Sequence, residues 1–274
     1  MCQVPAYVAH ANGYFADEGV AVSIAIEPTA WMVPAKLVRG ESQFAVMPWT
    51  RAAAGTEQDL PLVVVCGAGH EEAAIVVRQG IDVADVRRAS IPQRGGMKDL
   101  TAMGLIESLG WKDVEIRRQP SGDGAIISFF GQGCDAASMV EPYATLMEQL
   151  GVGRVVRRTG DVWPGAPGCS LTTTRQLAGD DPGLVGAVVS AFVRGARRAR
   201  EEPAEAAEVA AGYIGVAEQF IEEALRHHPP DVDAVRNTAA IDQILSLMAS
   251  LGYIETSAPD FIDLSFLDRV AQTV

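Results

Sequence analysis

The sequence is poor in the residues that mark metal, redox and nucleic-acid sites. Its four cysteines are far apart in the chain, with no Cys-x-x-Cys pair and no histidine at metal-ligand spacing: Cys2, Cys66, Cys134 and Cys169. We therefore expect no metal site, no cofactor and no disulfide bond. The net charge of −13 leaves no excess of basic residues, which argues against a nucleic-acid partner.

Long apolar runs and internal repeats are also absent from the sequence. No run approaches the roughly 18 residues of a membrane span, so direct insertion into a membrane is not expected. No charged and apolar leader precedes residue 2. Hydrophobic residues nevertheless make up 48% of the 274 residues. That content is enough for one large domain or for two lobes of roughly 100–150 residues each.

Residues 2–26 carry the most informative pattern. Pro5 suits the first turn of a helix, and apolar residues then recur at helical spacing as far as Tyr14. Turn signals at residues 12–13 and 17–19 end this helix, and alternating apolar residues predict a strand over residues 20–26. A loop that leads into a helix N-terminus leaves backbone N–H groups unpaired, which favours a bound anion.

The rest of the chain alternates predicted strands and helices. Residues 60–66 are fully apolar, as in strands of sheets that are covered on both faces. Other strands are predicted over residues 41–47, 73–77, 89–91, 114–116 and 169–174, and the chain is predicted to be helical from residue 181 onward. This alternation predicts an α/β fold.

The opening stretch resembles that of the solute-binding proteins of ATP-driven importers, of the sulfonate, nitrate, taurine and thiamine-precursor type. The matching positions are Pro5, Tyr7, Val8, Ala9, Gly13, Tyr14, Phe15, Glu18 and Gly19. Later matches are Gly40, Glu41, Phe44, Ala45, Asp135, Ala136, Glu141 and Pro142. The resemblance implies a two-lobed fold of the periplasmic-binding-protein kind (type II), with mixed sheets flanked by helices and a helical C-terminal tail. Lobe 1 would comprise residues 1–70 and 171–274, and lobe 2 residues 71–170.

The resemblance also implies a function. The chain would capture a small organic molecule, expected to be anionic, by closing its two lobes on it, and its partner would be an ATP-driven permease. The alternative is a cytosolic enzyme on the same fold, either a desulfinase-like thiol enzyme that uses Cys2 or a relative of the thiamine-precursor synthases. The synthase alternative is weakened because no cysteine cluster is present. A cytosolic sensor that binds a ligand without chemistry is the third possibility.

One departure from the family's sequence pattern affects the cellular compartment in which the protein is expected. Its members have a short buried strand before the opening loop, for which the sequence has no room ahead of Cys2. We expect a start codon placed too late, because loss of a central strand would leave neighbouring backbone groups without partners. A longer chain would be periplasmic or attached to the cell surface, whereas the chain as written would be cytoplasmic.

Candidate ligand-binding residues come from five short segments. The opening loop contributes Cys2, Gln3, Val4 and Tyr7. A thiolate at Cys2, beside a helix N-terminus, would have a lowered pKa and is the one candidate nucleophile, while the simpler interpretation is a small loop residue. Trp49 is predicted as an apolar wall, Thr50 as a hydroxyl donor and Arg51 as an anion clamp. Arg51 could equally be an exposed helix residue.

The remaining candidates lie after three later strands. His70 follows a buried strand and a glycine-rich turn, where open α/β sheets place ligand contacts. The second anion-binding loop would consist of Arg94, Gly95 and Gly96. Glu141 is predicted either to contact a ligand amine or to cap its own helix.

Overall fold

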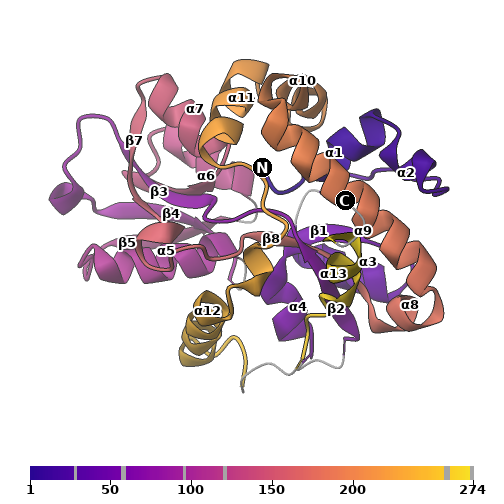
Figure 1. Ribbon diagram of the computed structural model, residues 1–274. Coiled ribbons are helices and arrows are strands. Elements are labelled where there is room, and N and C mark those ends of the chain that lie inside the picture. The colour runs from indigo at the N-terminus through magenta and orange to yellow at the C-terminus, as the bar shows by residue number, and fades with distance from the viewer. Residues whose placement is uncertain (28–29, 57–59, 95–96, 120–121, 256–259, 272–274) are drawn as a thin grey trace.

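The computed structural model describes residues 1–27, 30–56, 60–94, 97–119, 122–255 and 260–271, and contains two β-sheets (Figure 1). In the first sheet the strand order is β1-β8-β2. The central strand β8 (Cys169–Thr174) is antiparallel to both β1 (Ala45–Pro48) and β2 (Leu62–Gly67). All six residues of β2 are buried, as its continuous apolar sequence predicts.

The second sheet is mixed and has five strands in the order β5-β4-β6-β3-β7. Strand β4 is parallel to β5 and β6, whereas β3 is antiparallel to β6 and β7. The strands are β3 (Ala73–Arg78), β4 (Arg88–Pro92), β5 (Glu115–Gln119), β6 (Ala136–Val140) and β7 (Gly153–Arg158). The chain therefore passes between the two sheets twice, at residues 67–73 and 158–169, which we call the two crossovers.

Helices cover both sheets. The helices that contact the second sheet are α5 (Met97–Ser108), α6 (Gly122–Phe130) and α7 (Tyr143–Gln149). The other helices before the second crossover are α1 (Val4–Ala11), α2 (Tyr14–Asp17), α3 (Val33–Val38) and α4 (Trp49–Thr56). The C-terminal helices are α8 (Arg175–Asp180), α9 (Pro182–Glu201), α10 (Pro203–Ile214), α11 (Glu218–His227), α12 (Thr238–Ser250) and α13 (Ser265–Ala271). Among the described residues, no helix combines the length and apolar character that crossing a membrane requires.

The position of α1 is fixed by α9, the longest C-terminal helix. Asp181 caps α9 by accepting a hydrogen bond from the backbone N–H of Leu184 at 2.9 Å, and Pro182 occupies its first position. At Gly195 the two backbones come close: a Cβ placed there would lie 2.1 Å from the carbonyl oxygen of Pro5. Only glycine allows this approach, which sets where the residues before α1 lie.

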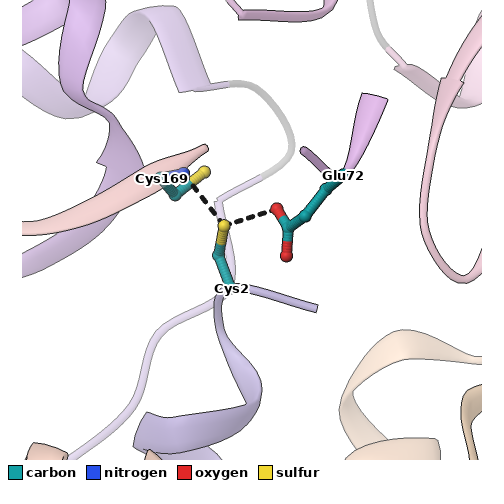
Figure 2. Close-up of side chains that lie close together, drawn as sticks. All are labelled: Cys2, Glu72 and Cys169. Atoms are coloured by element: carbon teal, nitrogen blue, oxygen red, sulfur yellow. Dashed lines mark hydrogen bonds between the residues drawn. The ribbon is translucent and has the colours of Figure 1, made fainter. Parts of the chain in front are cut away.

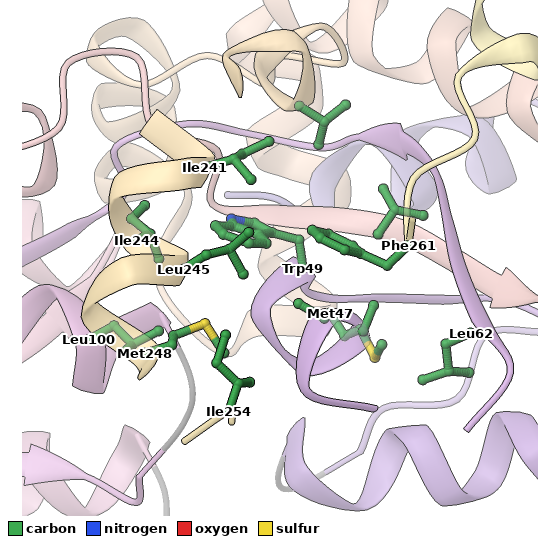
Figure 3. Packing of buried hydrophobic residues seen from close by; sticks show 14 of the residues in the cluster. Met47, Trp49, Leu62, Leu100, Ile241, Ile244, Leu245, Met248, Ile254 and Phe261 are labelled. Carbon is green, nitrogen blue, oxygen red and sulfur yellow. The ribbon is translucent and has the colours of Figure 1, made fainter. Parts of the chain in front are cut away.

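Trp49 begins α4 and lies in the core (Figure 3). Its indole Nε1 donates a hydrogen bond to the carbonyl oxygen of Pro167 at 2.9 Å, and its ring stacks on Phe261 with centroids 5.8 Å apart. Residues of α12, among them Ile244 and Met248, pack into the same cluster. The side chain of Trp49 has no exposed area, so it does not form the predicted apolar wall of a ligand site.

The segment of residues 20–26, predicted as a strand, has no regular secondary structure and joins no sheet within the part of the chain that the structure describes. Together with residues 44–46 and the first turns of α1, it lines a groove of about 490 Å³. Apolar side chains such as Phe192 and Leu171 form the floor of this groove. The expected strand ahead of residue 2 and the predicted lobe boundaries stay predictions.

Candidate functional site

The two crossovers run side by side and are joined by backbone hydrogen bonds. The N–H of Ala68 donates to the carbonyl of Cys169 at 3.1 Å, and the N–H of Gly168 donates to the carbonyl of Gly69 at 2.8 Å. His70 forms an isolated antiparallel bridge with Pro167. The two connections between the sheets therefore behave as a short two-stranded ribbon, and residues beside it belong to both halves of the molecule.

Three side chains meet beside this ribbon and form what we call the crossover cluster: Cys2, Glu72 and Cys169 (Figure 2). The Cys2 thiol donates to Oε2 of Glu72, and its sulfur accepts the backbone N–H of Cys169 at 3.0 Å. The sulfur and carboxylate oxygen atoms of the three residues lie within 4.8 Å of one another. Cys2 and Glu72 are buried, and Cys169 is half-buried.

Two glycines make room for the crossover cluster. A Cβ at Gly69 would lie 2.8 Å from Oε1 of Glu72 and 3.2 Å from the sulfur of Cys2. A Cβ at Gly168 would lie 3.1 Å from Oε2 of the same carboxylate. These two glycines thus let a carboxylate and a thiol pack directly against the backbone of the crossovers.

The environment of Cys2 contradicts the predicted lowered pKa. Burial raises the pKa of the Cys2 thiol well above its ordinary value, and the hydrogen bond with Cys169 and the charge of Glu72 act in the same direction. A helix N-terminus stabilises a negative charge by only about 0.3–1 kcal/mol at an exposed site. Loss of hydration is larger for a fully buried thiolate, so the neutral thiol is favoured.

A second polar group surrounds Glu141, which is buried at the start of α7. Its Oε2 accepts hydrogen bonds from the backbone N–H and the hydroxyl of Thr145, at 3.0 and 2.8 Å. Its Oε1 accepts from Arg158 at 2.6 Å and lies 3.7 Å from Nε2 of His228. Burial, together with the charge of Arg158, lowers the pKa of His228. Of the two predicted roles for Glu141, the structure shows the helix cap.

A third polar group centres on Asp99 of α5, which has no exposed area. Its carboxylate forms an ion pair with Arg118 and accepts a hydrogen bond from the hydroxyl of Tyr253 at 2.6 Å. Arg51, at the start of α4, is half-buried, and its Nε has no hydrogen-bond partner. Burial lowers the pKa of Arg51, while the charge of Asp99 opposes this effect.

The other predicted site residues lie in different surroundings. Val4 and Tyr7 are buried against α10 and α11, and the ring of Tyr7 stacks on Tyr213 with centroids 4.1 Å apart. Burial raises the pKa of Tyr7 to about 12. Val4 has no exposed area, which contradicts its assignment as a ligand contact, whereas Tyr7 also lines the groove beside α1 and stays a prediction. Further predicted residues are Thr50, which is buried, Gln3 and Arg94, which are exposed, and Gly95 and Gly96, which lie outside the described residues.

His70 remains a candidate, since it lies on the first crossover with a buried Nδ1 that has no hydrogen-bond partner. The nearest carboxylate oxygen in an ion-pair geometry belongs to Asp231, 3.8 Å away. Sequence reasoning missed Glu72 and Cys169 because their contact with Cys2 depends on the crossovers and on no local motif. The only available signal for Glu72 was its place two residues after His70.

Comparisons with known proteins agree with this architecture. The model of the NMT1-like family matches residues 1–215. The ligand-binding component of an ABC-type import system from Staphylococcus aureus, solved with zinc bound, is 14% identical, with a TM-score of 0.84 and coverage of 98% of this chain and 95% of that one. The alkanesulfonate-binding protein from Xanthomonas axonopodis pv. citri, bound to MOPS, is 14% identical with a TM-score of 0.80, covering 96% and 95%.

The periplasmic nitrate-binding protein from Synechocystis PCC 6803 is 15% identical, with a TM-score of 0.81 and coverage of 100% of this chain and 86% of that one. No curated protein matches the sequence. At these identities the solved structures establish the fold alone. They confirm the predicted α/β fold of the periplasmic-binding-protein kind.

Proposed function

The chain belongs to the NMT1-like family, and from this premise we propose that it is a solute-binding protein that captures a small organic anion between two lobes. Its partner would be the permease of an ATP-driven importer. Hinge closure at the two crossovers would bring the halves of the site together, and affinity would come from contacts made only in the closed state. The proteins of known structure described above, one bound to MOPS and one named for nitrate, support an anionic solute.

One observation carries the proposal: two buried side-chain nitrogen atoms without hydrogen-bond partners lie on α4 and on the first crossover. They are Nε of Arg51 and Nδ1 of His70; Oε1 of Glu72 and Oγ of Ser90 also lack a hydrogen bond. Buried polar atoms in folded proteins are nearly always paired, so such atoms are expected where a ligand supplies the partner. Arg51 would hold the anionic group, and His70 would bind a second polar group of the same solute.

The test is a thermal-shift screen of the purified chain against alkanesulfonates, sulfinates, nitrate, pyrimidines and aromatic acids, followed by calorimetry of each hit. A solute at about 100 times its Kd stabilises the folded chain by about 2.7 kcal/mol. We expect Arg51→Met to weaken binding at least about tenfold, since it removes a charged hydrogen bond. Arg226→Met is the matched control, because Arg226 is exposed on α11 and its ion pair among the described residues is with Glu222 on the same helix.

Two results would overturn the proposal. The first is a chain that none of these compounds stabilises and that releases no small molecule on denaturation, as judged by mass spectrometry. The second is a solute that binds Arg51→Met and the wild-type chain equally, which would place its site away from α4.

A further inference from the structure

We propose that the crossover cluster of Cys2, Glu72 and Cys169 is a binding site for one thiophilic divalent cation, with Zn²⁺ as the reference ion. The donor atoms already lie within 4.8 Å of one another. Zinc binds cysteine sulfur at about 2.3 Å and carboxylate oxygen at about 2.0–2.2 Å, which places donor atoms around one tetrahedral ion roughly 3.5–3.8 Å apart. The pair farthest apart would approach by about 1 Å, and the hydrogen-bonded Cys2 sulfur and Glu72 oxygen would separate by about 1 Å, both within the reach of side-chain rotation.

The surroundings of Glu72 supply a second and independent observation. Its side chain is only 8% exposed, and its Oε1 makes no hydrogen bond. Among the described residues, the positive charge within 4.0 Å of this carboxylate is the terminal ammonium of Met1, 3.2 Å from Oε1. Oε2 faces the sulfur of Cys2 instead. A buried carboxylate is costly unless a cation compensates it. The ammonium of Met1 lies on the Oε1 side, and among the described residues no cation pairs with Oε2, which faces Cys2.

The chemical types of the three donor atoms indicate which class of cation the site would bind. Two sulfur atoms and one carboxylate oxygen suit Zn²⁺ and Co²⁺, whereas Mg²⁺ and Ca²⁺ prefer oxygen ligands only. Three protein ligands leave a fourth position for water. On binding, the two thiol protons are released to solvent and both sulfur atoms coordinate as thiolates.

The positions of the three ligand side chains in the fold indicate what a bound cation would do. Cys2 lies just before α1 and Cys169 begins β8, on the side of the first sheet, whereas Glu72 lies just before β3 of the second sheet. One bound cation would therefore tie the two halves together at the crossovers. The proposal departs from the expectation of no metal site, which rested on sequence spacing alone. It does not depend on the solute proposal, since it needs no organic ligand.

The experiment is a titration of the full, reduced, metal-free chain with Co²⁺. We expect one Co²⁺ per chain, with a sulfur-to-cobalt charge-transfer band and the intense visible bands of tetrahedral coordination, both abolished by added Zn²⁺. Cys2→Ser and Cys169→Ser should each weaken Co²⁺ binding at least about 100-fold, and Glu72→Gln at least about tenfold. Cys134→Ser is the matched control, because Cys134 lies in a different hydrophobic cluster, and it should bind as the wild-type chain does.

The following results would refute the proposed cation site. Absence of the charge-transfer band, or binding that survives both Cys2→Ser and Cys169→Ser, would overturn the proposal. Formation of a Cys2–Cys169 disulfide in place of metal binding, seen as the loss of two titratable thiols, would also overturn it. If a serine variant fails to fold, X-ray absorption of the zinc-loaded wild-type chain decides the matter. Two sulfur ligands per zinc support the site, and an all-oxygen and nitrogen shell excludes it.

Discussion

Gly195→Ala should displace α1 and loosen the crossover cluster. The added methyl carbon would lie 2.1 Å from the carbonyl oxygen of Pro5, 3.0 Å from Cβ of Ala9 and 3.1 Å from its backbone nitrogen. Two of these three atoms are backbone, so relief requires α1 to move by about 1 Å away from α9, toward ordinary contact distances. Overpacking of this kind costs about 1–3 kcal/mol, and a rigid backbone neighbour places the cost near the upper end.

Alanine also has an intrinsic advantage over glycine within a helix, of about 0.5–1 kcal/mol. A matched control variant, Gly186→Ala, measures this helix-propensity contribution without the steric clash. Gly186 lies on the same helix, and a Cβ there would meet no atom within 4 Å. We expect Gly186→Ala to raise the thermal midpoint by roughly 2–4 °C and Gly195→Ala to lower it by roughly 2–10 °C.

The assay pairs thermal unfolding with labelling of Cys2 by a thiol reagent. Cys2 lies two residues before α1, so a displaced α1 should expose its buried sulfur and speed its labelling relative to the Gly186→Ala chain. A Gly195→Ala chain as stable as Gly186→Ala, with Cys2 labelled at the wild-type rate, would refute the claim that the α1–α9 contact positions this part of the site.

Two further predictions concern the polar groups around the crossovers. Tyr253→Phe should destabilise the chain by about 1–3 kcal/mol, because it removes a hydrogen bond to the buried carboxylate of Asp99; denaturant unfolding measures the loss. His228 has a lowered pKa, so below about pH 6.5 the unfolded chain binds more protons and stability falls as the pH drops. His228→Gln should reduce the fall in thermal midpoint between about pH 7.5 and 5.5, whereas His227→Gln, at the exposed neighbouring histidine, should keep it. An unchanged fall in His228→Gln would contradict the inference.

The parts of the fold that local pattern controls were predictable from the sequence. The helix after Pro5 follows from helical spacing, and the strand β2 follows from a continuous apolar run between turn residues. Residues 20–26 mark the limit of this reasoning. Their alternation predicts a strand, and the structure has none there, because a strand also needs a hydrogen-bonding neighbour and that depends on distant residues.

The candidate site was predictable only in its location. A strand's carboxyl end indicates that Trp49 and Arg51 lie near the crossovers, yet it does not say which way each side chain points. Trp49 turns into the cluster formed with α12, whereas Arg51 keeps an unpartnered nitrogen. Cys2 and Cys169 are 167 positions apart, so no spacing rule for ligand pairs could join them. Cys2 meets Cys169 because the two crossovers run side by side next to the loop that carries Cys2.

The crossover cluster also weighs against a thiol enzyme. Burial raises the pKa of the Cys2 thiol, and the charge of Glu72 acts in the same direction, so the surroundings oppose loss of the Cys2 proton. Glu72 therefore accepts a hydrogen bond from the thiol without activating it. A divalent cation at the proposed site would change this, since a coordinating thiol is deprotonated outright. Cys2 would then be a thiolate as a metal ligand and not as a free nucleophile, which is the arrangement of a binding site.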